Sequence, residues 1–333
     1  MSFEVPLRIG VVGLGYIGTT VGTQFHRNPD AKIGAVCDLD ENLLNEVGNR
    51  FDVPPHHRYV DDERMLDEAP LDAVLIGTPH ALHFEQVMRA LDRGLDVYCD
   101  KPLTTDLERA RAIVERAEGG NETLMVGYQR HLQTAFQLAR DRFRVTSPEW
   151  FTASITQNWL EYSRGTWRTD PALSGGGFLY DTGSHLIDGV IWTTGLEPTA
   201  VRASMDFVDE DSRVDRRAHL DVRFDGGMTG TFSFNGDAAA VREHVHVWDD
   251  DGAVYLEGRG WGSRRVVEID ENGNECLPHI DRRREQDRAE AFVESVRTGA
   301  DPPATARDAL SVTALTEAAY ESATVGKWIT VQE

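Results

Sequence analysis

Short apolar runs alternate with amphipathic stretches over the first 128 residues of the chain. The apolar runs predict strands at Leu7–Val12, Ile33–Asp38, Ala73–Gly77, Asp96–Asp100 and Leu124–Tyr128. The stretches between them predict helices at Tyr16–Arg27, Glu41–Arg50, Leu82–Arg93 and Leu107–Ala117. Strands that alternate with helices pair in parallel and are covered on both faces. Residues 1–127 are therefore predicted to form a doubly wound α/β domain.

The pattern changes after about Arg144, where strands follow one another with short turns between them. The predicted strands are Trp150–Trp159, Ala200–Val208, Ala218–Phe224, Met228–Phe234, His244–Trp248, Ala253–Glu257 and Arg265–Ile269. Glycine-rich turns such as Asp225–Gly227 and Asn272–Asn274 indicate a mainly antiparallel sheet. Helices are predicted at Phe178–Thr194, Glu285–Arg297 and Ala306–Ser322. Residues 128–333 are thus expected to form an α+β domain with a large open sheet, and whether the closing helix packs back on the first domain stays open.

Composition agrees with two folded, soluble domains. The chain has 333 residues, of which 40% are hydrophobic and 27% charged, so a sizeable core is possible. No stretch approaches the roughly 20 apolar residues that span a bilayer, and glycines interrupt the apolar run near Met1, so a cytoplasmic protein without signal peptide or membrane partner is expected. The three cysteines have neither disulfide nor metal-ligand spacing, and no metal site is predicted.

The charge balance excludes some partners. Asp and Glu number 56 against 34 Lys and Arg, which gives a net charge of −22 and disfavours nucleic acid or an anionic membrane as a partner. The only lysines are Lys32, Lys101 and Lys327. An acidic, lysine-poor surface is typical of halophilic proteins, because salt screens the repulsion among carboxylates. A GC-rich gene that favours arginine codons is the other explanation.

A glycine motif follows the first predicted strand and opens the first predicted helix. Glycines in this context allow a tight turn and close approach of a dinucleotide pyrophosphate to a helix N-terminus. Asp38 ends the second strand 20 residues after Gly18 and can accept hydrogen bonds from the adenosine ribose. Asp40 and Glu41 add carboxylates where a 2′-phosphate would need a cation, so NAD is predicted rather than NADP. The motif residues expected to bind the cofactor are Gly13, Gly15, Tyr16, Ile17 and Gly18.

Further motifs add to the prediction of a dinucleotide-binding domain a resemblance to a known protein family. Gly77-Thr78-Pro79-His80 and Asp100-Lys101-Pro102 each end a predicted strand, and a glycine run opens the segment from Gly175 to Asp188. Together with Thr166-Trp167-Arg168 and Ala319-Tyr320-Glu321-Ser322, these motifs resemble the glucose–fructose oxidoreductase and inositol dehydrogenase family, often written Gfo/Idh/MocA. The resemblance covers nearly the whole chain.

The resemblance implies a Rossmann domain followed by a domain with a large open sheet that commonly forms homodimers or homotetramers. It also implies oxidation or reduction of a hydroxyl or carbonyl group on a sugar or cyclic polyol with NAD or NADP. The family's catalytic lysine corresponds to Lys101, and its aspartate and histidine correspond to Asp181 and His185. Where the family usually has Glu-Lys-Pro, this chain has Asp100 before the lysine.

Residue spacing agrees with these assignments. Asp181, His185, Asp188 and Trp192 are four, three and four residues apart, so they are predicted to share one helix face. His185 is expected to be the immediate acid or base, because an imidazole titrates near neutral pH. Lys101 would then stabilise developing alkoxide charge, although a lysine with a lowered pKa could itself be the base.

Other residues are expected to surround the cofactor and the substrate. Thr78, Pro79 and His80 are expected beside the nicotinamide ribose. The candidates for the substrate cleft are Gln129, Arg130, Trp159, Tyr162 and Arg168.

The sequence therefore predicts an NAD-dependent dehydrogenase that acts on CH–OH groups of a sugar or cyclic polyol. Two alternatives stay open. One is a nucleotide-bound sensor without turnover, and the other is an enzyme that uses bound NAD for a net non-redox reaction such as glycoside cleavage.

Overall fold

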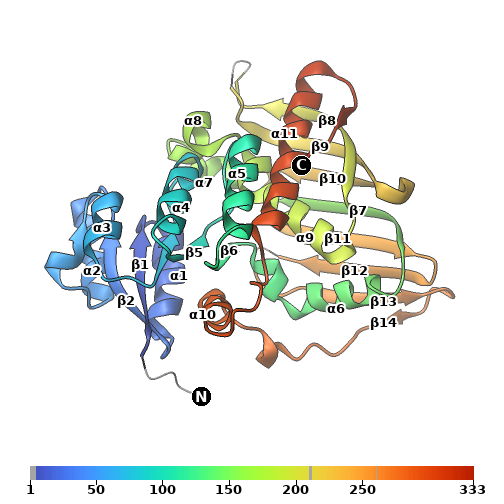
Figure 1. Cartoon of the computed structure of the whole chain (residues 1–333). Coiled ribbons are helices and arrows are strands. Elements are labelled where there is room, and N and C mark those ends of the chain that lie inside the picture. The colour runs from blue at the N-terminus through green and yellow to red at the C-terminus, as the bar shows by residue number, and fades with distance from the viewer. Residues whose placement is uncertain (1–4, 210–211, 260) are drawn as a thin grey trace. The chain divides into compact units, whose positions relative to one another are not determined.

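The computed structural model of the chain describes residues 5–209, 212–259 and 261–333, and it divides into two compact units (Figure 1). The first unit comprises residues 1–104, 108–129 and 286–309. The second comprises residues 105–107, 130–285 and 310–333. A single boundary near residue 127 does not describe this division, because residues 286–309 belong to the first unit.

The first unit contains a six-stranded parallel sheet in the order β3-β2-β1-β4-β5-β6. Its strands are β1 (Leu7–Val12), β2 (Ala31–Cys37), β3 (Arg58–Tyr59), β4 (Ala73–Ile76), β5 (Asp96–Cys99) and β6 (Leu124–Val126). Its helices are α1 (Tyr16–Arg27), α2 (Glu41–Arg50), α3 (Asp62–Glu68), α4 (His83–Leu91), α5 (Leu107–Glu118) and α10 (Arg288–Thr298), with the first residue of α5 in the other unit. The parallel sheet is confirmed, while β3 and α3 were not predicted because two and seven residues give too little periodicity.

The strand order reverses beside β1, which places the carboxyl ends of β1 and β4 next to each other. Right-handed crossovers then put the helices on both faces of the sheet. Buried residues fill nearly every position of β1 and β4, as expected for strands covered on both sides. Helix α10 completes the unit, where Phe292 makes edge contacts with Phe25 and Tyr98.

The second unit contains a nine-stranded sheet in the order β14-β13-β12-β11-β7-β10-β9-β8-β15. Its strands are β7 (Pro148–Thr156), β8 (Pro198–Phe207), β9 (Asp215–Phe224), β10 (Thr229–Asn235), β11 (Arg242–Asp249), β12 (Gly252–Gly258), β13 (Arg265–Asp270), β14 (Glu275–Cys276) and β15 (Ile329–Thr330). Strands β7 and β10 pair in parallel, and every other neighbouring pair is antiparallel. The predicted mainly antiparallel sheet is confirmed.

The helices of the second unit differ more from the prediction. They are α6 (Thr134–Phe143), α7 (Trp159–Ser163), α8 (Pro171–Ser174), α9 (Ser184–Thr194) and α11 (Ala306–Val325), with the first four residues of α11 in the other unit. The predicted helix Phe178–Thr194 is a π-helical turn over Leu179–Gly183 followed by α9. The predicted strand Trp150–Trp159 ends at Thr156, and Trp159 begins α7.

The two faces of this sheet have different surroundings. Val245 and Val247 on β11 are buried on the face where α6 and α9 contact the sheet. The intervening residues His246 and Trp248 lie on the other face and are only partly covered. This alternation is the period-two pattern of a sheet with one face packed under helices.

Candidate active site

The glycine loop of the first unit is tightly packed at two of its three glycines. Gly13 has a positive φ of 80°, and a Cβ atom there would lie 2.8 Å from Thr78 Cγ2. A Cβ atom on Gly18 would lie 1.8 Å from the carbonyl oxygen of Gly13. Only glycine allows this turn to close against the end of β4.

Gly15 differs from the other two glycines. A Cβ atom there would meet nothing within 4 Å, so the loop leaves open space at this position. Gly15 is also the N-cap of α1 and provides no side-chain cap for the first N–H groups of the helix. Uncapped N–H groups beside open space are what a dinucleotide pyrophosphate requires. The residues present therefore fit such a cofactor.

Asp38 lies directly after β2 and contacts the glycine loop. Its Oδ2 accepts a hydrogen bond from Leu14 N at 2.7 Å, and its Oδ1 accepts one from Asp40 N at 2.9 Å. The Asp40 side chain caps α2. The nearby cation on β3, Arg58, donates to Asn49 Oδ1 and to the carbonyl oxygen of Val53, both at 2.7 Å. Asp38 is thus a carboxylate at the ribose end of the expected site, while Arg58 is engaged elsewhere.

The segment around Lys101 is fixed by a buried histidine. His83 Nδ1 lies 2.8 Å from the carbonyl oxygen of Pro102, and its Nε2 lies 2.9 Å from that of Thr78. Burial lowers the pKa of His83, while its hydrogen bonds to these two carbonyl groups oppose that effect. His83 therefore links the end of β4 to the segment that follows β5. Lys101 is 6% exposed, and the peptide bond to Pro102 is cis.

Asp100 and the neighbouring predicted residues are also buried. Burial raises the pKa of Asp100, and the Lys101 and His83 charges partly oppose that effect. His80 is 2% exposed. Thr78 Oγ1 donates to Gln86 Oε1 at 2.6 Å. These contacts hold the carboxyl ends of β4 and β5 in fixed conformations.

In the second unit, Asp181 is held by two residues that were predicted to line the substrate cleft. Asp181 Oδ2 accepts from Trp159 Nε1 at 2.8 Å and from Arg168 Nε at 3.1 Å. Trp159 is fully buried. Tyr162, which was also predicted to line the cleft, is 54% exposed. Trp159 and Arg168 therefore orient the carboxylate.

His185 lies against an aromatic residue that was not predicted. The His185 and Trp261 ring centroids are 4.7 Å apart, and Trp261 is 39% exposed. Trp261 belongs to the connection between β12 and β13, 76 positions along the chain, so no local pattern links it to the histidine. An exposed indole beside an imidazole provides an apolar surface at this point of the site.

The four residues predicted to share one helix face do not share one environment. Asp188 and Trp192 contact His131, whereas Asp181 and His185 have the partners described above. His131 Nε2 lies 2.9 Å from Asp188 Oδ1, and the His131 ring stacks on Trp192 at 4.2 Å. Both members of the His131–Asp188 pair are fully buried. The π-helical turn is wider than an α-helical one, so it alters the expected alignment of Asp181 with the rest of α9. Asp188 and Trp192 therefore pack against α6 and its preceding segment.

Arg130, another predicted cleft residue, is 1% exposed and belongs to a buried ion cluster. Glu243 lies between Arg130 and Arg264, with Arg130 Nε at 3.0 Å and Arg264 Nε at 3.1 Å from Glu243 Oε1. Burial alone would raise the pKa of Glu243, but the two guanidinium groups outweigh it and lower the pKa. The Arg130 guanidinium carbon also lies 5.6 Å from the centre of the Trp261 ring. This cluster supports the segment that carries Trp261.

Other residues of the chain fill the space beside the glycine run that precedes the π-helical turn. A Cβ atom on Gly177 would lie 2.1 Å from the Asp215 carbonyl oxygen, and one on Gly176 would lie 2.2 Å from the Tyr320 hydroxyl. Asp215 accepts from Gly177 N at 3.0 Å and also from the Tyr320 hydroxyl. Burial raises the pKa of Asp215, opposed by these hydrogen bonds. The run anchors the start of the segment with Asp181 and His185 to β9 and α11.

Two negative statements hold for residues 5–209, 212–259 and 261–333. Within these ranges, no group of three or more His, Cys, Asp or Glu side chains could hold a metal ion. None of the helices described is long and apolar enough to cross a membrane.

The chain belongs to the Gfo/Idh/MocA oxidoreductase family. The family's NAD-binding Rossmann-fold model matches residues 7–128, and the model of its C-terminal domain matches residues 144–255. The resemblance in the motifs is thereby confirmed.

Its relatives include sugar and polyol dehydrogenases. The D-xylose 1-dehydrogenase (NADP(+)) 2 of Haloferax volcanii is 26% identical over 329 residues, covering 96% of this chain and 98% of the relative. The myo-inositol 2-dehydrogenase of Thermotoga maritima is 24% identical over 340 residues, covering 95% and 96%. The crystal structure of an oxidoreductase domain protein from Kribbella flavida covers 99% of this chain and all of its own, with a TM-score of 0.85 at 20% identity, which shows the shared fold.

Proposed function

We propose that this protein is a dehydrogenase that transfers a hydride between NAD and a carbinol carbon of a sugar or cyclic polyol. The family membership and the sugar and polyol dehydrogenases among the relatives support the reaction class. The open position at Gly15 beside the uncapped start of α1 supports a dinucleotide cofactor. When bound, the nicotinamide ring supplies the hydride donor or acceptor.

Asp38, the residue after β2, is the reason for proposing NAD rather than NADP. The Asp38 carboxylate accepts from the glycine loop, and Asp40 and Glu41 follow it. A 2′-phosphate at this position would meet negative charge, and Arg58 is engaged with Asn49 and Val53. The relative from Haloferax volcanii is named for NADP, so this chain would differ from it in cofactor choice.

Three residues would carry the proton chemistry. The His185 imidazole would take the hydroxyl proton as the hydride leaves the same carbon. The Lys101 ammonium would stabilise the developing alkoxide; alternatively, Lys101 would take the proton and His185 would stabilise the alkoxide. Asp181, fixed by Trp159 and Arg168, would bind a neighbouring hydroxyl or orient the imidazole. Thr78, Pro79 and His80 would lie beside the nicotinamide ribose.

Trp261 would contribute the apolar side of the substrate site. A pyranose or cyclitol has faces of C–H groups that pack on an aromatic ring, while its hydroxyl groups bond to polar side chains. The contact of Trp261 with His185 places such a ring beside the proposed acid or base. Arg130 and Trp159, which are buried, would support this site without touching substrate.

We also propose that the second unit forms homodimers or homotetramers through the uncovered face of its sheet. Trp150 is 43% exposed there and lies 4.5 Å from Trp248 in ring-centroid distance. Exposed aromatic residues of this kind are enriched at protein interfaces. Sedimentation velocity of the wild type and of Trp150→Asp tests this, with a shift to monomer expected only for the variant.

The decisive experiment is a screen of aldoses and cyclic polyols for NADH absorbance in molar KCl, followed by three variants. Lys101→Ala, His185→Ala and Asp181→Ala should each keep NAD binding and lower turnover by roughly 10²–10⁴. The matched control is His56→Ala, an exposed histidine of the first unit, which should retain wild-type turnover. Near-normal kcat in both Lys101→Ala and His185→Ala would refute the mechanism. NAD retained through purification without net NADH would favour a net non-redox reaction, and NAD binding without any turnover would favour a sensor.

A further inference from the structure

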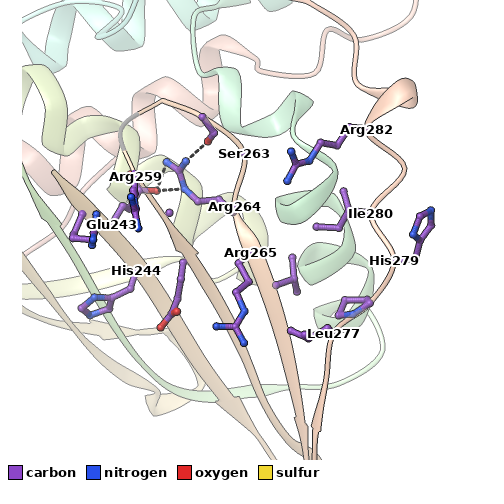
Figure 2. Close-up of a pocket in the computed structure, with 16 residues that line it drawn as sticks. Glu243, His244, Arg259, Ser263, Arg264, Arg265, Leu277, His279, Ile280 and Arg282 are labelled. Carbon is purple, nitrogen blue, oxygen red and sulfur yellow. Dashed lines mark hydrogen bonds and ion pairs between the residues drawn. The ribbon is translucent and has the colours of Figure 1, made fainter.

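A large hollow lies in the second unit at one end of β11, β12 and β13 (Figure 2). Its volume is about 1220 Å³. One side is formed by these strands and the β12–β13 connection, and the other by the segment from Leu277 to Arg282, which follows β14. The charged and histidine side chains that line it are Arg242, Glu243, His244, Glu257, Arg259, Arg264, Arg265, His279 and Arg282.

The register of the sheet explains how one arginine in the hollow lacks a carboxylate partner. Glu257 pairs with His244 on one side and with Arg265 on the other, so the three residues form a row across adjacent strands. Glu257 Oε1 instead lies 3.1 Å from Nε2 of His246. Arg265 is therefore directly opposite a glutamate that is engaged with another residue.

Four exposed arginines that line the hollow lack a carboxylate partner. Among the residues that the structure describes, Arg242, Arg259, Arg265 and Arg282 form no ion pair, and only Arg242 donates a side-chain hydrogen bond, to the Val241 carbonyl oxygen. Carboxylates outnumber basic residues by 56 to 34 in this chain, and elsewhere arginines commonly pair, as in Arg142 with Asp249 at 2.7 Å. Four unpaired guanidinium groups around one hollow are therefore a local concentration of positive charge in an acidic protein.

The carboxylates in the hollow do not cancel this charge. Glu243 is already bound by two guanidinium groups, those of buried Arg130 and Arg264. Glu257 is the only other carboxylate in the lining, and it faces His246. The lining thus contains five arginines and two glutamates. One of these glutamates, Glu243, also pairs with Arg130, which is not part of the lining.

We propose that this hollow, whose lining includes none of Lys101, Asp181 and His185, binds the phosphate group of a small phosphorylated metabolite. Guanidinium groups bind phosphate oxygens through paired, charge-assisted hydrogen bonds. The volume is far larger than one phosphate ion occupies, and Leu277, which is 60% exposed, provides apolar surface for an organic portion. The phosphate recognition is the same whether the metabolite is a phosphorylated substrate that reaches from the active site or a separate effector.

Binding of inorganic pyrophosphate is the direct test. Because the glycine loop can also bind pyrophosphate, titration calorimetry is performed with the loop saturated by NAD and at fixed KCl concentration. The wild type should bind pyrophosphate, and Arg259→Gln, Arg265→Gln and Arg282→Gln should each weaken the dissociation constant by at least about tenfold. The matched control is Arg202→Gln, because Arg202 on β8 is also exposed and has no ion pair among the described residues, and it should leave binding unchanged.

Each other outcome overturns the proposal or identifies the source of the phosphate. No pyrophosphate binding to the NAD-loaded wild type, or equal loss in Arg202→Gln, overturns it. Dissociation of an oligomer by Arg265→Glu without any pyrophosphate binding also overturns it, since the hollow would then receive the acidic surface of a second copy. If binding is confirmed, competition of pyrophosphate with the sugar substrate supports a phosphorylated substrate, and unchanged KM for that substrate supports an effector.

Discussion

Two glycine-rich segments precede helices in this protein, one in each unit, and their surroundings differ at one glycine. In Gly13–Gly18 the middle glycine, Gly15, faces space that no atom within 4 Å fills. In Gly175–Gly177 each glycine is met closely by the chain itself, by Thr105, Tyr320 and Asp215 in turn. Similar composition therefore serves two purposes, since one segment leaves room for a ligand and the other allows tight internal packing.

The difference teaches how to separate binding glycines from structural ones. At a structural glycine, an added methyl group collides with atoms that cannot move, so the folded state loses stability. At a binding glycine, the methyl group collides only with the ligand, so stability is kept and affinity falls. The following predictions test this separation, from the largest expected effect to the smallest.

Gly177→Ala should be the most damaging change. Its Cβ atom would lie 2.1 Å from the Asp215 carbonyl oxygen and 2.3 Å from the Asp215 nitrogen, and neither backbone atom can move without shifting β9. We expect a loss of about 4 kcal/mol in the free energy of unfolding, or no folded protein at all. Thermal unfolding followed by circular dichroism measures it, and a melting temperature within about 2 °C of the wild type would contradict the structural role.

Gly15→Ala should do the reverse. The φ of −63° at Gly15 suits alanine, and the methyl group meets nothing, so the melting temperature without cofactor should not change. NAD affinity should fall about 30-fold, which corresponds to about 2 kcal/mol. Gly13→Ala is the contrast within the same loop, because its positive φ and its contact with Thr78 should lower stability. Unchanged NAD affinity in a folded Gly15→Ala protein would remove the argument for the cofactor position.

Cofactor preference is the next largest effect. Because Asp38 lies against the loop at Leu14, NAD should be preferred over NADP by at least about tenfold in kcat/KM, or about 1.4 kcal/mol. Asp38→Ser should reduce that preference mainly by weakening NAD. Steady-state kinetics with both cofactors decide the matter, and equal use of both by the wild type would show that the carboxylate does not select.

Salt should shift both glycine variants equally. With a net charge of −22, the folded protein gains stability when KCl is raised from low to molar concentration, because carboxylate repulsion is screened. The difference in melting temperature between Gly15→Ala and Gly177→Ala should persist, since neither substitution adds or removes a charge. A melting temperature of the wild type that stays flat or falls over this range would count against a halophilic adaptation.

Local patterns in the sequence were sufficient for the longer strands of both sheets and for the glycine loop with Asp38. A strand that is buried on one or both faces records its surroundings in its own hydrophobic residues, and β1 was predicted with its observed bounds. The loop between β1 and α1 is equally local, because the residues that form it are consecutive. Short elements such as β3 were not predicted, since two residues are too few to show an alternation of apolar and polar positions.

Only the tertiary structure decided which polar residues meet. Asp188 was predicted on the face of His185, but it pairs with His131, 57 positions away, and Arg130 meets Glu243 across 113 positions. Trp261 reaches His185 only because the β12–β13 connection extends to that point. Such contacts depend on strand register and on how the helices pack on the sheet, and no short segment of the chain records either, because each partner's local sequence is compatible with many other neighbours.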